Sequence, residues 1–428
     1  MKCDCCGIES PLDAAFRPIV RVFQKPWRYC PTCANRRDRS LHDRSFWVGL
    51  TLMSFVGACA FAVASPQNRD IFLFAPALLA FFWLCVVPHE LAHALAARLL
   101  GLRVFRIFIG SWGPVVWRQS IFGIEICVTP IPSGGLTLVG APTLRFVGWR
   151  WALMVAAGPL ANGLLAVAAL CLRPGVWGES LVVPFATANL LLVIVSLFPW
   201  RHATTFGQFA SDGLVLLSSP FTSRDTLLKR HIYYFAQEGM EQIQRKNYRA
   251  AIDWAERGLR EYPADNTISG VLGVAQLGLE DFPAARKTFI DCLESCGENL
   301  EQRALFLNNV GWTDLFMGNL SLLEEADRYS AEAFRIAPWV SWIQGTRGMV
   351  LVEFDHFDEG IDLLKKALAR NPDPQSKASN ACCLAIAFAR KCDQDKSRHY
   401  LAQARKLDAK CALIPRVERE LSAPEVRV

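Results

Sequence analysis

The chain has 428 residues, 52% of them hydrophobic, and its formal net charge is only +6. This length exceeds that of one ordinary domain, and so small a positive charge gives no reason to expect nucleic-acid binding. Residues 46–220 are strongly apolar and residues 236–428 are charged, so we expect a mainly α-helical protein with a polytopic membrane core and a soluble helical half.

The chain has fifteen cysteines. Residues 1–45 are polar and contain two cysteine pairs, each with two residues between its members. Two turns that each present two thiolates can hold one zinc ion in a closed tetrahedral site, and the alternative is a set of unligated thiols. We therefore predict a small zinc-ribbon-like module with a structural zinc ion, which serves folding or docking and not catalysis. The predicted ligands are Cys3, Cys6, Cys30 and Cys33, and Cys5 could replace either neighbour.

Four apolar runs are each long enough to cross a bilayer, for which about 20 residues are needed. Arginines precede the first run and occur between the second and third, whereas the two short loops on the other side hold one arginine each. Because positive charge marks the cytoplasmic side, we expect a multi-pass protein of the plasma or inner membrane with both termini in the cytoplasm. The runs are Phe46–Ala64, Ile71–Leu100, Trp151–Leu172 and Leu181–Trp200.

The second apolar run contains the motif His-Glu-Leu-Ala-His at residues 89–93. On a helix, His89 and His93 share one face, so their imidazoles can bind one metal ion. Glu90 lies on the flank, where it can act as acid and base on water that zinc activates. The motif also arises by chance, but each ionisable residue at the bilayer centre costs about 2.5–3.5 kcal/mol, which favours a functional role. We therefore predict a catalytic zinc site inside the membrane.

Between the second and third runs, residues 104–140 are rich in β-branched and aromatic side chains and contain several glycines. This composition is typical of short strands joined by turns, so we expect a β-strand insertion in the helical core. Strand edges at membrane depth must be covered or paired. An edge that faces the active site could pair with an extended substrate, with Gly134 and Gly135 as the expected contacts.

A zinc ion that keeps one open position needs a third protein ligand. The candidates in the apolar region are Asp70, Glu125, Glu179 and Asp212, with His202 as a further choice. Asp212 is favoured, because it is the only carboxylate in a short apolar segment after the fourth run and a glycine follows it. The sequence leaves open whether residues 205–219 span, re-enter or only dip into the membrane.

The charged half contains an internal repeat. A large side chain followed three positions later by a small one recurs at 248, 282, 323 and 357, with two steps of 34 residues and an insertion between them. This period matches the helix–turn–helix unit of tetratricopeptide repeats, and generic helical hairpins are the alternative. We expect an α-solenoid over residues 236–412, preceded by a linker at 221–235 and followed by a tail at 413–428. Its concave surface would bind a cytosolic protein or peptide.

Over roughly residues 75–220, the chain resembles the site-2 protease family of intramembrane zinc metalloproteases. Four features agree in order: the motif at 89–93, the glycine-rich strand region with Gly-Ser-Trp-Gly-Pro at 110–114 and Pro-Ser-Gly-Gly at 132–135, Gly-Pro-Leu-Ala-Asn at 158–162, and Ser-Asp-Gly at 211–213. The resemblance implies that His89, His93 and Asp212 bind zinc and that Glu90 is the acid and base. It also implies a metalloprotease domain over residues 46–220 that cleaves transmembrane substrates near the cytoplasmic side, in regulated intramembrane proteolysis.

One position departs from the family pattern. The family commonly has an asparagine three residues before a proline, and this chain has Ser196 before Pro199. Asn162 and Asn189 are the candidates to contact the substrate in its place, and helix packing is the alternative role for Asn162.

Three other functions compete with an intramembrane protease whose repeats recruit a substrate or a regulator. A catalytically silent membrane scaffold would act through its repeats, but it has no use for Glu90. A metal transporter would need polar residues along several spans, and the third and fourth runs hold few. A soluble zinc protease would need a water-exposed helix face, which residues 71–100 do not offer. The substrate, its cleavage site and the oligomeric state do not follow from the sequence.

Overall fold

The computed structural model describes residues 1–12, 17–21, 24–34, 69–110, 115–129, 134–171, 179–204, 207–317, 319–371 and 373–422. The chain forms two compact units. We call Asn35–Glu238 the membrane unit, and Met1–Ala34 together with Gly239–Val428 the repeat unit. The first predicted span, residues 46–64, lies outside the described residues.

Three long apolar helices pack against one another in the membrane unit: α3 (Arg69–Leu99), α4 (Val147–Cys171) and α5 (Glu179–Leu197). Within the described residues, Pro76–Leu99 and Val147–Cys171 are long and apolar enough to cross a membrane, and α5 holds a shorter apolar stretch. One face of α4 leaves large apolar side chains uncovered at helical spacing, as a lipid-facing helix would. These side chains are Leu153, Leu160, Leu164, Val167 and Leu170.

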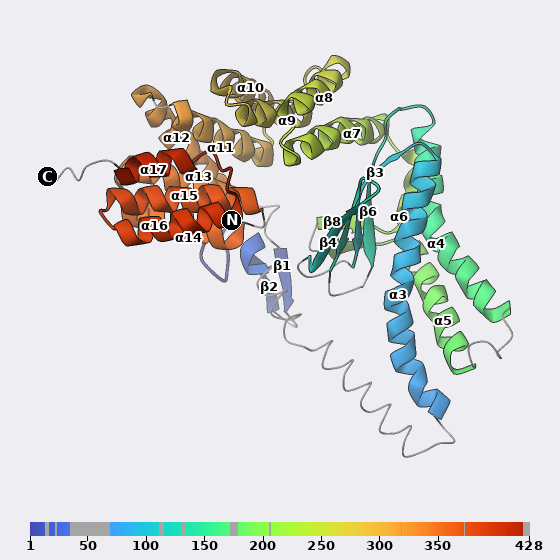
Figure 1. Cartoon of the computed structure of the whole chain (residues 1–428). Coiled ribbons are helices and arrows are strands. Elements are labelled where there is room, and N and C mark those ends of the chain that lie inside the picture. Colours follow the sequence, from blue (N-terminus) through green and yellow to red (C-terminus); the bar gives the residue numbers. More distant parts are fainter. Residues whose placement is uncertain are drawn as a thin grey trace. The chain divides into compact units, whose positions relative to one another are not determined.

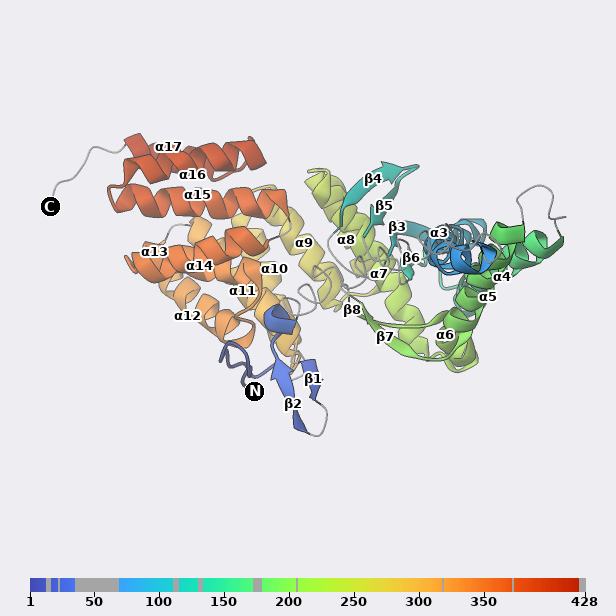
Figure 2. The ribbon, with the colours of Figure 1, turned by 90° about the horizontal axis from the view of Figure 1, so that it is seen from below.

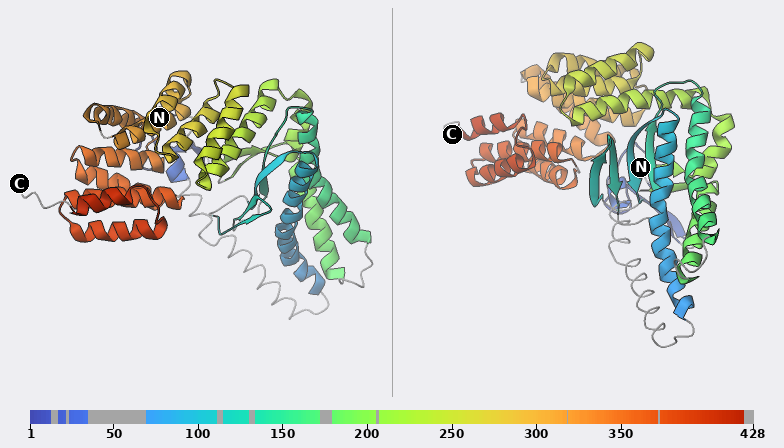
Figure 3. Two further views of the ribbon diagram at one scale, coloured as in Figure 1. Left: turned by 45° about the horizontal axis from the view of Figure 1, so that its top comes forward. Right: turned by 45° about the vertical axis from the view of Figure 1, so that its right-hand side comes forward.

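A four-stranded sheet lies beside α3 (Figures 1 and 3), which confirms the expected β insertion. Its order is β4-β5-β3-β6, and β3 pairs with β5 in parallel and with β6 antiparallel. The inner face of β3 packs its branched side chains against α3 and α4 in the core of the unit. The strands are β3 (Arg103–Ile109), β4 (Trp117–Ile121), β5 (Ile124–Val128) and β6 (Gly135–Gly140).

After α5 the chain forms a hairpin of β7 (Arg201–Thr204) and β8 (Gly207–Ala210) and then the short helix α6 (Asp212–Ser218). Ser211 caps α6, because its hydroxyl accepts from the N–H of Leu214 and donates to the Phe198 carbonyl. A Cβ at Gly213 would lie 1.7 Å from the Leu197 carbonyl oxygen. Glycine therefore lets the start of α6 contact the end of α5, which fixes Asp212.

A short η4 turn (Ser219–Phe221) leads into α7 (Arg224–Gln244), and the boundary between the two units falls within this helix. Residues 221–235, expected to be a linker, are therefore largely helical. Within the membrane unit α7 lies against the end of β6, since the Ala141 N–H donates to the Arg230 carbonyl.

Helical hairpins stack along the repeat unit, and the pairs α11–α12, α13–α14 and α15–α16 lie one beside the next in Figures 1 and 2. Tetratricopeptide-like repeats are thus confirmed as the architecture of this half, and ion pairs such as Arg286–Asp314 join neighbouring hairpins. Residues 413–428, expected to be a tail, include a helix that packs against α15. The helices are α8 (Tyr248–Glu261), α9 (Asn266–Gly278), α10 (Phe282–Ser295), α11 (Leu300–Met317), α12 (Leu320–Ile336), α13 (Ser341–Glu353), α14 (Phe357–Arg370), α15 (Pro374–Arg390), α16 (Gln394–Leu407) and α17 (Ile414–Ser422).

The N-terminal cysteine module (Met1–Ala34) belongs to the repeat unit and not to the membrane unit. It contains an antiparallel hairpin of β1 (Arg17–Arg21) and β2 (Gln24–Tyr29), followed by one helical turn at residues 31–34. The first cysteine pair precedes the hairpin and the second follows it, so the hairpin returns the chain to its start.

Candidate active site

His89 and His93 lie one turn apart on α3, and their side chains are buried. Their Nε2 atoms are 3.1 Å apart. Helix α4 packs directly over the pair, because a Cβ at Gly158 would lie 2.3 Å from Nε2 of His93 and 2.7 Å from Nε2 of His89. Only a glycine lets α4 come this close, which gives a physical reason for the first residue of the Gly-Pro-Leu-Ala-Asn sequence.

The other ring nitrogen of each histidine has a fixed partner. Nδ1 of His89 lies 2.6 Å from Oδ1 of Asn162, and Nδ1 of His93 lies 2.8 Å from the Met154 carbonyl oxygen. The amide of Asn162 in turn donates to Oδ1 of Asn189 and to the Cys85 carbonyl. Both Nδ1 atoms therefore carry the proton, and both Nε2 atoms are free to act as metal ligands.

Asp212 comes to the histidine pair from 123 residues along the chain. Its Oδ2 lies 3.1 Å from Nε2 of His89 and 3.6 Å from Nε2 of His93. The cap by Ser211 and the close contact at Gly213 hold α6 in the position that brings this carboxylate inward. Two imidazole nitrogens and one carboxylate oxygen thus converge on one point.

Glu90 is buried beside this point and has a partner that the sequence analysis missed. The Thr137 hydroxyl on β6 donates to Oε2 of Glu90 over 2.7 Å. A Cβ at Gly135 would lie 2.4 Å from Cγ of Glu90, so glycine lets β6 approach the carboxylate. Thr137 stands two positions after Gly135 and faces the same side of the strand, and this alternation is the signal that could have identified it.

A cavity of about 660 Å³ opens onto these side chains. Its polar surface comes from His89, Glu90, His93 and Asp212, together with Gly134, Gly135, Thr137, Ser196, Arg201 and Ser211. The rest of the wall is largely apolar and includes Phe82, Val86, Leu192, Trp200 and Phe209. The cavity therefore joins a polar centre to walls suited to an apolar segment.

Some residues from the sequence analysis have other roles in the structure. Asn162, expected to contact a substrate, is fully buried and holds His89, because α4 places its amide behind the imidazole. Glu125, considered as a ligand, forms ion pairs with Arg106 and Arg118 on the sheet. The hydroxyl of Ser196 donates to the Val193 carbonyl in its own helix.

The chain combines two described helices that are long and apolar enough to cross a membrane with a buried His-Glu-His group that could hold a metal ion, and both are features of membrane metalloproteases. It belongs to Peptidase family M50, whose model matches residues 77–376. The resemblance to site-2 proteases is thereby confirmed.

Two curated relatives carry related names. Metalloprotease MmpA from Caulobacter vibrioides is 27% identical over 253 residues, which cover 47% of this chain and 56% of the relative. Regulator of sigma-E protease RseP from Salmonella typhimurium is 34% identical over 131 residues, which cover 27% of this chain and 29% of the relative. The chain thus spans about half or less of the length of these relatives.

Among solved structures, a tetratricopeptide protein from Thermus thermophilus, TTC0263, is 21% identical to this chain. The match covers 44% of this chain and 98% of that protein, with a TM-score of 0.37.

Proposed function

We propose that this protein is a zinc endopeptidase that hydrolyses peptide bonds of transmembrane proteins within the bilayer. The observation that carries this proposal is the meeting of His89, His93, Asp212 and Glu90 in one largely apolar cavity. Membership of Peptidase family M50 supports it. The intact Glu90 and its Thr137 partner disfavour a silent scaffold of the same fold, because a scaffold needs no general base.

The donor set fits a catalytic zinc ion. Nε2 of His89, Nε2 of His93 and a carboxylate oxygen of Asp212 would be its ligands, and three protein ligands leave one position open. Nδ1 of each histidine has a hydrogen-bond partner, as is usual for histidines that bind zinc through Nε2. A bound zinc ion would supply Lewis acidity and make water a stronger nucleophile at neutral pH.

Glu90 is the proton carrier in the proposed reaction. Its carboxylate accepts the proton of the attacking water as the oxygen adds to the peptide carbonyl carbon. It then donates that proton to the leaving nitrogen as the C–N bond breaks. The hydrogen bond from Thr137 fixes one carboxylate oxygen and leaves the other for this transfer.

The apolar walls suit the side chains of a transmembrane segment, and Gly134 and Gly135 on the wall support the expectation that they contact the substrate backbone. The cytosolic repeats would recruit the soluble tail of that substrate or a regulator. A second zinc ion, with a structural role, would be held by Cys3, Cys6, Cys30 and Cys33, whose sulfur atoms lie within 4.8 Å of one another.

We further propose four membrane crossings with both termini in the cytoplasm. The cysteine module and the repeats form one compact unit, which supports an even number of crossings between them. Helices α3, α4 and α5 would supply three, and residues 46–64 the fourth. Helix α6 has seven residues, about 10 Å of helix against a core of about 30 Å, so the Asp212 segment would re-enter and not span.

The test is co-expression with single-span membrane proteins that carry tagged cytosolic domains. The wild-type chain should release at least one tagged domain, and the Glu90→Gln variant should release none. Equal patterns with both forms for every substrate would refute proteolysis. A His93→Ala variant that keeps its full zinc content would refute the ligand assignment.

A further inference from the structure

The cysteine module makes specific contacts with the turn between α12 and α13. The Ser10 hydroxyl donates to the carbonyl of Ile336, the last residue of α12, and this serine is buried. Trp339, three residues later, packs against the cluster of Cys3, Cys30 and Cys33. Residues 326 positions apart in the sequence therefore meet in one small interface.

The first ten residues form a closed loop that presents Ser10 to the turn. The N-terminal amine donates to the Ser10 carbonyl over 2.6 Å, and the Ser10 N–H donates to the Met1 carbonyl over 2.9 Å. The Gly7 N–H donates to the Cys3 carbonyl, and Gly7 adopts a positive φ of 75°. This turn folds the chain back after the first cysteine pair.

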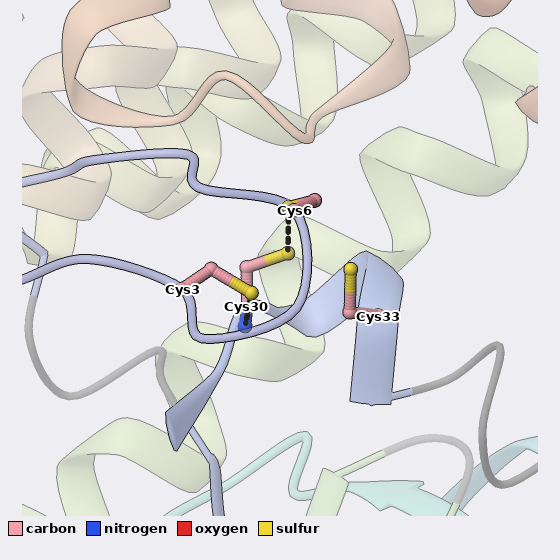
Figure 4. Close-up of side chains that lie close together, drawn as sticks. All are labelled: Cys3, Cys6, Cys30 and Cys33. Carbon is pink, nitrogen blue, oxygen red and sulfur yellow. Dashed lines mark hydrogen bonds between the residues drawn. The ribbon is translucent and has the colours of Figure 1, made fainter. Parts of the chain in front are cut away.

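The four thiols of the module are arranged for a metal ion (Figure 4). Sγ of Cys6 lies 3.7 Å from Sγ of Cys30. Tetrahedral zinc with bonds of about 2.3 Å would place its sulfur ligands about 3.8 Å apart, whereas a disulfide needs about 2.05 Å. The Cys30 N–H donates to Sγ of Cys3 over 3.2 Å, a bond that suits a thiolate acceptor.

Within residues 1–12 and 28–34 of the module, the buried apolar side chains are Cys3, Cys30, Cys33 and Ala34. Its buried cluster consists of Cys3, Cys30 and Cys33, with Met1, Tyr29 and Trp339 packed around them. Segments shorter than about 40 residues generally need a metal, a disulfide or a partner to fold. Here the thiols can bind a metal ion, and the α12–α13 turn of the repeats is the partner.

We infer that the cysteine module is a zinc-dependent clasp, which binds the α12–α13 turn of the repeats only while its four thiols hold the metal. The clasp thereby ties the segment before the first predicted span to the hairpins α11–α12 and α13–α14. It rests on the structural zinc ion of the proposed function and is independent of the catalytic one. Metal loss would free the N-terminus from the repeats.

The test uses the full chain in lipid nanodiscs and measures zinc content together with hydrogen exchange. The Cys33→Ser variant should lose one zinc ion, and the amides of residues 1–12 and 336–340 should exchange at least about tenfold faster. Cys392 is exposed and lies outside the thiol cluster, so Cys392→Ser is the control and should change neither reading.

A second pair of variants separates docking from metal binding. Trp339→Ala should keep the zinc ion yet speed exchange in residues 1–12. Trp342→Ala, at a tryptophan of α13 that is 51% exposed, should leave exchange as in the wild type.

Three results would overturn the inference: unchanged zinc content in Cys33→Ser, unchanged exchange after zinc removal, or a Cys6–Cys30 disulfide in anaerobically purified protein. None of these readings involves cleavage. A chain that holds this zinc ion and cleaves nothing would refute the protease proposal and leave the clasp intact, and the reverse result would refute the clasp alone.

Discussion

Gly158 on α4 stands directly over His93 on α3, so that a single added carbon would lie 2.3 Å from the imidazole Nε2. The approach of the two helices at this point makes the proposed metal site an outcome of helix packing as well as of ligand chemistry. Gly158→Ala should displace both imidazoles and weaken zinc binding by at least about tenfold, as measured by competition with a chelator.

The control for this prediction is Gly163→Ala on the same helix. A Cβ there would meet its nearest neighbour at 4.0 Å, an ordinary contact, so zinc binding should not change. Wild-type zinc affinity in Gly158→Ala would contradict the packing argument.

Thr137 should matter for proton transfer and not for zinc binding. Thr137→Val removes the hydroxyl that donates to Glu90 and leaves the shape nearly unchanged. A hydrogen bond to a charged group contributes about 1.5–3 kcal/mol, so we expect kcat to fall by about 10- to 100-fold at constant zinc content.

Thr129→Val is the matched control, because the Thr129 hydroxyl is buried without a hydrogen-bond partner in the described part of the structure. This variant should keep the wild-type kcat. Equal kcat values for Thr137→Val and the wild type would exclude a positioning role for Thr137.

Asn162 should act through His89. Asn162→Leu removes the partner of Nδ1, and the loss of such an outer partner typically costs 10- to 100-fold in metal affinity, or about 1.4–2.7 kcal/mol. Leu160→Ala changes a 62% exposed side chain of the same helix and should leave the zinc affinity unchanged. If Asn162→Leu raised KM and kept the zinc affinity, Asn162 would instead contact the substrate.

The placing of His89 and His93 on one helix face could be predicted from the sequence, because the motif at residues 89–93 acts over a few residues. The helical hairpins of the repeat unit could also be predicted, since their period is local. The partner of Glu90 was not predicted, because Thr137 reaches it through the packing of β6 on α3, and its place two positions after Gly135 is the one local signal for it. Contact between Ser10 and Ile336 spans 326 residues and has no local signal.

The repeat unit should become more stable as the pH falls towards 5. Burial raises the pKa of Asp314 to about 6 from its ordinary value of 3.8, although the Arg286 guanidinium opposes this effect. Because the folded pKa lies above the unfolded one, the stabilisation is present at low pH and is lost as the pH rises through about 6. Deprotonation of Asp314 should lower the free energy of unfolding by roughly 1 kcal/mol as the pH rises from 5 to 7.

Hydrogen exchange of α11 as a function of pH measures this contribution. Asp314→Asn should remove this part of the pH dependence, and Asp253→Asn, on the exposed face of α8, should retain it. A pH dependence that persists in Asp314→Asn would assign the effect to another group.

The most direct test of the central claim is cleavage by purified protein in a bilayer, with zinc content measured on the same samples. The wild-type chain and Glu90→Gln should hold the same amount of zinc, and only the wild type should cut a single-span substrate, with new termini inside its apolar segment. Equal cleavage by both forms, or product termini only in the soluble tail, would contradict an intramembrane protease that uses Glu90 as its proton carrier.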